Sequence, residues 1–316
     1  MPKKSYIEKY RSQLAFTLIE VSIVMVIIGL VVGAVVVGRD MITTAAIRAT
    51  ITQIQGYNAA VRQFEEKYRY LPGDISASAV QKFGFSVVPV RAGTIGQGNG
   101  NGLIENYLYV AAKSYVSCCI SGENAWFWED LSANSGLIED NFNTAGAFSI
   151  PFTSERTTIK IEHIIPRSKL KKGVYVSVYS TPQAKNYLSL LAFGTAGALD
   201  GNGAIRNNSV MLTVNEAYSI DAKMDDGLPQ SGLVIAKYQQ WDIASAAVGG
   251  SGPAGNYGLV WASGGNVQGA IDTSATPSSS ITCFDNNNVA AAVQKYSIAK
   301  NPNSANCALS FELNLQ

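Results

Sequence analysis

Few side chains in this 316-residue chain are of the types that catalysis or metal binding requires. His163 is the single histidine, so a Ser/His/Asp nucleophile or a multi-histidine metal site would have to include it. It falls in the run from Thr157 to Ile165, on the apolar side of an alternating pattern that is typical of a strand. No acid–base partner has a spacing from it that is typical of a catalytic pair. We therefore expect a histidine in the core or at its rim, and a protein that is not an enzyme.

Glu20 is the ionisable side chain with the most unusual surroundings. It lies between the apolar residues 16–19 and the run Val21–Gly38, which is eighteen residues without a charge. An ionisable group within such a stretch costs about 2.5–3.5 kcal/mol on insertion into a bilayer, so it usually has a partner. Cleavage of the chain behind Ala15 would create one. The new α-amine of Phe16 would lie one helical turn from Glu20, or would meet the Glu20 of a neighbouring chain.

The apolar stretch around Glu20 is long enough to cross a bilayer as a helix. Four basic residues and one acid precede it: Lys3, Lys4, Lys9, Arg11 and Glu8. The positive-inside tendency predicts that the N-terminus stays in the cytoplasm and that everything after Gly38 is exported. Beyond residue 15, 20 basic and 22 acidic residues remain, a net charge of −2 that predicts no dominant interaction with nucleic acid.

Residues 15–20, Ala-Phe-Thr-Leu-Ile-Glu, resemble the prepilin peptidase site of type IV pilins and type II secretion pseudopilins. That family has a short basic leader, a small residue before the cut, a Phe-Thr-Leu-Ile-Glu start and an apolar helix. The resemblance implies cleavage between Ala15 and Phe16, N-methylation of Phe16, and a role for Glu20 in assembly. Ala15 departs from the family pattern, which nearly always has glycine at that position.

The same resemblance implies what the protein does and where. It would be a structural subunit of a type IV pilus or a type II secretion pseudopilus. Its partners would be prepilin peptidase, an inner-membrane assembly platform, other pilin or pseudopilin subunits and, before assembly, membrane lipid. It would cross the bacterial inner membrane once with a periplasmic C-terminal domain, and would then enter a filament that can be extracellular. The choice between pilus and pseudopilus, and between major and minor subunit, stays open.

Two other kinds of protein would share an apolar N-terminal segment. A secretory signal peptide has a shorter apolar stretch, of about 7–15 residues, and an A-x-A-like cleavage site. The other alternative is a membrane-anchored periplasmic binding protein or hydrolase with an uncleaved signal anchor. Neither explains Glu20, which therefore favours the pilin-like interpretation.

The helical pattern continues beyond the apolar run. Apolar side chains recur at spacings of three, four or seven: Ile47, Ile51, Ile54, Val61, Phe64, Tyr68 and Leu71. Pro72-Gly73 then ends the run. The sequence predicts one helix from Phe16 to about Arg69 with an apolar stripe on its second half. Gly29 and Gly33 form a GxxxG, which fits either close packing between helices or ordinary glycines of a membrane helix.

These features predict an α+β protein of the pilin-like lollipop kind, a long N-terminal helix packed on an antiparallel sheet. Its parts would be a leader (1–15), a transmembrane half (16–38) and an amphipathic half (39–71) of the helix, and an exported globular domain (72–316) whose C-terminal region (283–307) is bracketed by cysteines. Strands are expected at 157–165, at 174–179, at 187–193 and at 233–241. A short helix is expected over 123–135, burying Trp128 and Leu131 and stopped by Gly136.

Three segments of the exported domain resemble segments of a subset of pilin-like proteins: Tyr70–Asp74, Gly98–Glu105 and Trp128–Ile138. The glycines at 96–102 follow a G-x-G-x-G-x-G spacing, which is not the G-x-G-x-x-G of a dinucleotide site. No strand–turn–helix context surrounds them either. A connecting loop is the simpler interpretation of this run.

The chain has four cysteines, Cys118, Cys119, Cys283 and Cys307. An even number without CxxC spacing, in an exported domain, fits two disulfides better than zinc. Pilins often bridge the C-terminal region, so the resemblance implies a Cys283–Cys307 bond, which would contribute about 3 kcal/mol. Cys118 and Cys119 are adjacent, and they could bridge each other or pair elsewhere.

Carboxylates near glycine turns make Ca²⁺ the one candidate cofactor. Some pseudopilins bind Ca²⁺ in a distal loop, and Asp200, Asn202, Asp225 and Asp226 supply oxygen ligands of the kind that it prefers. The EF-hand spacing fails, however, because Ala204 stands where an oxygen ligand is needed. Turn and helix-cap chemistry explains the same residues.

Two more polar groupings have simple explanations. Thr213 to Glu216 reads as a capping box that opens a helix ending at about Lys223. Four basic residues crowd one turn: Arg167, Lys169, Lys171 and Lys172. DNA-uptake pilins use such patches, but a solvated turn is the better interpretation.

Overall fold

The structure is a computed structural model. It describes residues 17–85, 98–104, 123–143, 161–171, 173–181, 184–193, 208–209, 212–239, 259–261, 283–285, 293–299 and 302–313. The chain divides into two compact units, Met1–Ala45 and Ala46–Gln316, and each is described by itself.

In the first unit the described residues belong almost entirely to helix α1 (Leu18–Tyr68), which begins here and continues into the second unit. Its side chains from Leu18 to Val37 are exposed, and nearly all of them are apolar. Among the described residues, α1 is the one helix that is long and apolar enough to cross a membrane, by length and composition alone. So much exposed apolar surface requires a cover of lipid or protein.

The second half of α1 carries the predicted apolar stripe into the core of the second unit. Ile47, Ile54, Val61 and Phe64 are buried, as the spacing predicts, and Thr50, Tyr57 and Ala60 join them. Ile51 and Tyr68 pack against the same core but remain partly exposed. The helix ends at Tyr68 because Arg69 adopts a φ of 65° and the Pro72-Gly73 turn follows, with Gly73 at a φ of 81°.

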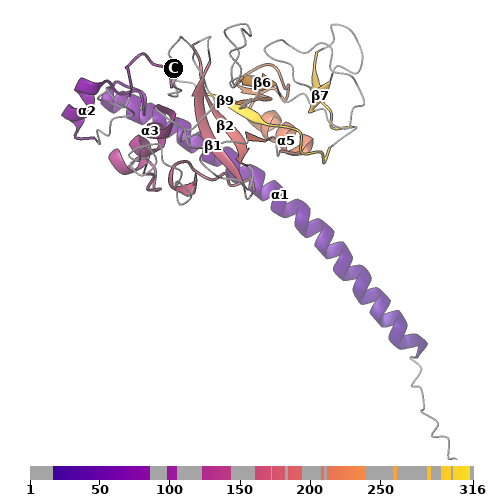
Figure 1. Cartoon of the computed structure of the whole chain (residues 1–316). Helices are drawn as coiled ribbons and strands as arrows, with labels where there is room; N and C mark the ends of the chain where they lie inside the picture. The colour runs from indigo at the N-terminus through magenta and orange to yellow at the C-terminus, as the bar shows by residue number, and fades with distance from the viewer. Residues whose placement is uncertain are drawn as a thin grey trace, which may run out of the picture. The chain divides into compact units, whose positions relative to one another are not determined.

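The main sheet of the second unit is antiparallel and runs in the order β1-β2-β9-β4, with β3 paired to β2. Figure 1 labels three of these strands, β1, β2 and β9. Its strands are β1 (Val174–Ser180), β2 (Asn186–Phe193), β3 (Asn208–Ser209), β4 (Val234–Ile235) and β9 (Leu309–Glu312). Val176 faces Leu190 across β1 and β2, and Leu188 faces Phe311 across β2 and β9. These side chains share one hydrophobic core with the α1 stripe. The α+β class and the antiparallel sheet are therefore confirmed.

Shorter elements complete the described part of the second unit. The helices are α2 (Ala77–Phe83), α3 (Glu123–Glu129) with the π-helical turn η1 (Asp130–Asn134), the 3₁₀ turn η2 (Ile161–His163) and α5 (Val214–Met224). Two two-stranded antiparallel sheets pair β5 (Lys237–Gln239) with β6 (Leu259–Trp261), and β7 (Phe284–Asp285) with β8 (Lys295–Tyr296). The predicted helix over 123–135 corresponds to α3 and η1, where Trp128 and Leu131 are fully buried.

One predicted strand is wrong. Residues 161–163 form the 3₁₀ turn η2, and residues 157–160 lie outside the described residues. The amides of Ile164 and Ile165 both bond back to the carbonyl of Ile161. Ile164 and Ile165 are both buried although they are consecutive, which an alternating strand does not allow. Pro166 follows at once and has no N–H to donate to a strand ladder.

The predicted run over 233–241 is interrupted rather than continuous. Ala236 separates β4 from β5 because its amide bonds to the carbonyl of Pro229 and not to a neighbouring strand. The chain therefore leaves the main sheet after Ile235 and pairs with β6 instead.

Candidate functional site

The first turn of α1 is closed by a reciprocal pair of side chains. The backbone amide and the hydroxyl of Thr17 both donate to Oε2 of Glu20, each at 2.8 Å. The amide of Glu20 donates back to Oγ1 of Thr17 at 3.3 Å. This is a capping box, in which two otherwise unpaired helix N–H groups are satisfied. The Thr-x-x-Glu spacing is visible in the sequence, but our sequence analysis recognised it only at Thr213.

The capping box places the Glu20 carboxylate at the exposed start of an apolar helix. Its Oε2 is engaged by Thr17. Within the described residues, Oε1 accepts no hydrogen bond, so this oxygen can accept one from an amine of another chain. Ala15 and Phe16, the predicted cleavage and methylation residues, lie outside the described residues.

Gly29 and Gly33 lie on the exposed part of α1. Apart from the neighbouring residues and backbone of α1 itself, no described heavy atom lies within 4 Å of the position that a β-carbon would occupy at either residue. A second helix can therefore approach the backbone closely at these positions, as a GxxxG allows.

A second notable cluster is built around the carboxylate of Asp74, which is buried with 1% of its surface exposed. Gly100 donates to Oδ1 at 2.6 Å and Gly102 donates to Oδ2 at 2.7 Å. Burial raises the pKa of Asp74, while the backbone N–H groups of residues 99–102 oppose that rise because they favour the charged form. The Gly/Asn run is thus an anion-binding nest filled by a side chain of the same chain.

Two neighbouring carboxylates bind nearby backbone amides: Glu123 of α3 binds the same loop, and Asp130 of η1 binds the turn at Gly73. Glu123 accepts from the amide of Asn99 at 3.2 Å, and Asp130 accepts from the amide of Gly73 at 2.7 Å. A β-carbon on Gly98 would lie 2.6 Å from Cα of Asp74 and 2.7 Å from Oε1 of Glu123, so only glycine fits there. This explains physically why glycine is needed at the start of the run, which sequence reasoning interpreted only as a connecting loop.

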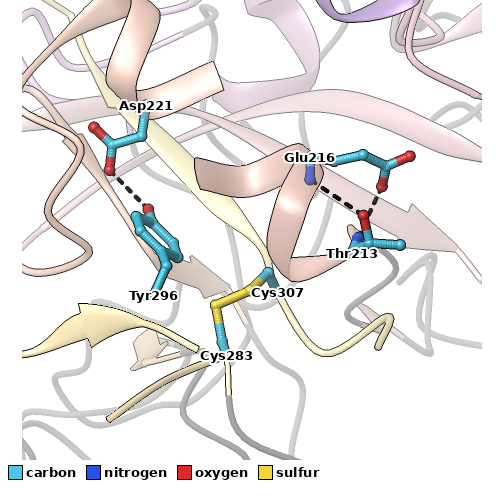
Figure 2. The surroundings of a disulfide bond; sticks show 6 residues. All are labelled: Thr213, Glu216, Asp221, Cys283, Tyr296 and Cys307. Carbon is cyan, nitrogen blue, oxygen red and sulfur yellow. Dashed lines mark hydrogen bonds between the residues drawn. A yellow bond between two sulfur atoms is a disulfide. The ribbon is translucent and has the colours of Figure 1, made fainter. Parts of the chain in front are cut away.

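Cys283 and Cys307 are joined by a disulfide in the structure (Figure 2). Cys307 also pairs its backbone with Leu212, just ahead of α5. The predicted capping box at the start of α5 is confirmed, since Thr213 and Glu216 exchange both of its hydrogen bonds. Cys118 and Cys119 lie outside the described residues.

Three carboxylates gather at the end of α5. Those of Asp221, Asp225 and Asp226 offer oxygens within 4.8 Å of one another. Asp225 and Asp226 were predicted as oxygen ligands for Ca²⁺. Asp221 was missed although it lies one helical turn before Asp225. Asp200 and Asn202 lie outside the described residues.

Every member of this acidic cluster already accepts hydrogen bonds. Asp221 accepts from the amide of Gly227 at 3.1 Å and from the hydroxyl of Tyr296 at 2.7 Å, the latter drawn in Figure 2. Asp225 accepts from the amides of Leu233 and Val234. The last member, Asp226, accepts from the amide of Leu228 and the hydroxyl of Ser231. Cap and turn chemistry accounts for these contacts, and Ca²⁺ binding stays a prediction.

Asp221 makes the stability of the domain depend on pH. Burial raises the pKa of Asp221 from 3.8 to about 7, so between these values the folded chain keeps a proton that the unfolded chain loses. The resulting stabilisation is present below about pH 4 and is lost as the pH rises to about 7. We expect the full-length protein to be less stable at pH 8 than at pH 5, and Asp221→Asn to remove on the order of 2–4 kcal/mol of that difference. Urea unfolding at both pH values in a chelating buffer measures it. An equal pH dependence in the variant would contradict the prediction.

The basic turn is partly neutralised by acids. Arg167 lies 2.5 Å from Glu162, and Lys171 lies 2.6 Å from Glu216. Lys172 lies outside the described residues. Two of its cations are therefore already paired, which favours a solvated turn over a patch for nucleic acid.

His163 is exposed on the 3₁₀ turn η2. The expectation of a histidine on an apolar strand face is therefore wrong, because the chain turns at this point instead of extending.

Comparison with known proteins identifies the N-terminal segment. Residues 10–36 match the family model of the prokaryotic N-terminal methylation motif. Neither the curated proteins nor the solved structures contain a significant match to the chain. The matched residues include Thr17 and Glu20 and the exposed apolar start of α1. The chain thus carries the N-terminal methylation motif that is the hallmark of the prepilin-type signal of type IV pilins and pseudopilins.

Proposed function

We propose that the protein is a structural subunit of a type IV pilus or a type II secretion pseudopilus. It is processed by prepilin peptidase, held in the inner membrane by α1, and polymerised through that helix by an inner-membrane assembly platform. The observation that carries the proposal is the position of Glu20. Its carboxylate stands at the exposed first turn of an apolar helix, within a matched N-terminal methylation motif.

The exposed apolar surface of α1 supports polymerisation. Before assembly, lipid covers the side chains from Leu18 to Val37; after assembly, the helices of neighbouring subunits cover them. Gly29 and Gly33 leave room for such helices to approach.

In this arrangement Glu20 receives the amine of Phe16 from a neighbouring subunit. An uncleaved anchor on a periplasmic binding protein or hydrolase would have no such use for the carboxylate, because no free amine forms beside it. The exported domain would then form the filament surface in a pilus, or the part that acts in the periplasm in a pseudopilus.

Processing of the N-terminus is the first test. In cells that contain a prepilin peptidase, we expect a mature protein that begins at N-methyl-Phe16. Ala15→Gly should be cleaved at least as well, because the residue before the cut must be small. Ala15→Leu should remain uncleaved for the same reason. Intact mass and N-terminal peptide mass spectrometry measure these outcomes, and a mature chain that starts beyond residue 30 would instead identify an ordinary signal peptide.

A further inference from the structure

A groove of about 790 Å³ opens on the second unit beside α1. Ala49 and Thr52 form its helical wall, and both are exposed. Tyr57, Phe142 and Pro166, all buried, lie below them and give the groove an apolar floor. A helical wall of small side chains and an apolar floor suit an incoming helix that carries one large apolar side chain.

The groove is held open by side chains that are already paired. The amide of Gln53 donates to the carbonyl of Arg167 at 2.8 Å and accepts from the amide of Lys169 at 2.9 Å. Arg167 pairs with Glu162 at 2.5 Å. These contacts fix the 162–169 segment against α1, so the groove exists before any partner arrives.

Asp140 is the carboxylate on the rim without a partner in the described part of the chain. It is exposed and accepts no hydrogen bond or ion pair there. The charge of Asp140 acts on the hydroxyl of Tyr57 inside the groove. Burial, more than the Asp140 charge, raises the pKa of the Tyr57 hydroxyl to about 12. A cation docked in the groove would lie next to this carboxylate.

One segment of the same chain has the matching chemistry. Residues 39–42, Arg-Asp-Met-Ile, follow the uncharged run directly. Ile42 exposes 71% of its surface and Met41 exposes 68%. The guanidinium of Arg39 makes no hydrogen bond or ion pair among the described residues. Arg39 and Ile42 are three residues apart, so they lie on one face of α1.

We propose that this groove is an interface between subunits, in which residues 39–42 of a second copy dock with Ile42 over Tyr57 and Phe142 and with Arg39 at Asp140. The inference rests on the proposed function, because it requires subunits that assemble through α1. When the apolar run of α1 is buried in a filament, Arg39 at its edge loses water and needs a carboxylate partner. A guanidinium is well suited to such a partly dry pair because its planar fork matches a carboxylate.

A charge-reversal cycle in the full-length chain tests the pairing. The variants are Arg39→Glu, Asp140→Arg and the double variant, produced in cells with an intact assembly system. Glu139→Arg is the matched control, because Glu139 is also exposed and adjacent but does not line the groove. The measurement is the amount of subunit in sheared, sedimented polymer relative to the amount in the membrane.

We expect each single reversal to reduce the polymer fraction by about tenfold or more, since like charges then face each other in the interface. The double variant should regain most of the loss, and Glu139→Arg should assemble normally. Membrane levels should be unchanged in all four, which shows that the variants fold. Normal assembly of both single variants, or no recovery in the double variant, overturns the groove proposal while wild-type polymer still supports the proposed function. Absence of polymer from the wild type would count against the proposed function itself.

Discussion

Glu20→Gln is expected to leave the protein synthesised, cleaved and inserted in the membrane at near-normal levels, yet almost absent from filaments. In an apolar filament core the substitution removes one half of an ion pair with the amine of a neighbour's Phe16. Leaving the other charge buried without a partner typically costs about 3–5 kcal/mol, which corresponds to a loss of assembly of about a hundredfold or more. Insertion of the single subunit into the membrane should not be impaired, because loss of a carboxylate lowers the cost of insertion.

The capping box at Thr17 sharpens this experiment. Glutamine in place of Glu20 can still complete the box, so Glu20→Gln removes the charge and keeps the cap. Thr17→Val does the reverse, since it removes the hydroxyl and keeps the carboxylate. Loss of a cap costs about 1 kcal/mol, so Thr17→Val should reduce assembly several-fold at most. The two variants thus separate the electrostatic role of Glu20 from its role in starting the helix.

The readout is polymer yield in the sheared fraction beside total membrane-bound protein. If Glu20→Gln assembles as well as the wild type, the ion-pair explanation is wrong and the carboxylate serves only the helix end. If Thr17→Val fails as severely as Glu20→Gln, the cap rather than the charge is what assembly requires.

Asp74→Ala is expected to destabilise the second unit strongly. Removal of the carboxylate takes away the acceptor of the Gly100 and Gly102 amides, and water takes its place because both glycines are exposed. A hydrogen bond to a charged acceptor contributes about 1.5–3 kcal/mol, so the loss of both is about 3 kcal/mol. Asp74→Asn should lose less, because its amide oxygen still accepts one bond while its NH₂ group faces another N–H.

Thermal or urea unfolding of the full-length protein in detergent measures both variants. Glu66→Gln is the control, since Glu66 is exposed on α1 and a neutral result is expected there. Gly98→Ala should resemble Asp74→Ala, because the added methyl displaces Asp74 from the loop. An unchanged midpoint for Asp74→Ala would show that the nest contributes nothing to stability.

The sequence predicted most reliably the elements whose pattern is periodic and long. The stripe from Ile47 to Phe64 could be found because a helix buries every third or fourth side chain against one sheet. Strands β1 and β2 were found from alternating residue types, although consecutive residues of both strands are buried. The short alternation before Pro166 failed because a few residues fit a 3₁₀ turn as well as a strand.

The parts that could not be predicted depend on contacts between distant residues. Asp74 fills a loop that lies 26 residues later in the chain, and no local spacing reveals that pairing. The groove beside α1 likewise joins Tyr57 to Phe142 and Pro166 from three separate segments. Asp221 and the Thr17 cap could have been predicted. Asp221 lies one helical turn before Asp225, and Thr17 has the Thr-x-x-Glu spacing of a capping box.

The position of β9 has a consequence for biogenesis. This strand, Leu309–Glu312, is made long after β1 and β2, yet it lies inside the sheet between β2 and β4. Phe311 faces both neighbours, so the two strands cannot share a finished core until it arrives. If the second unit is exported as we propose, the emerging chain is therefore held in an unfinished state until residues 309–312 have crossed the membrane. Folding of this sheet thus reports that β9 has crossed, and a chain truncated before Leu309 should be recognised as unfolded and degraded.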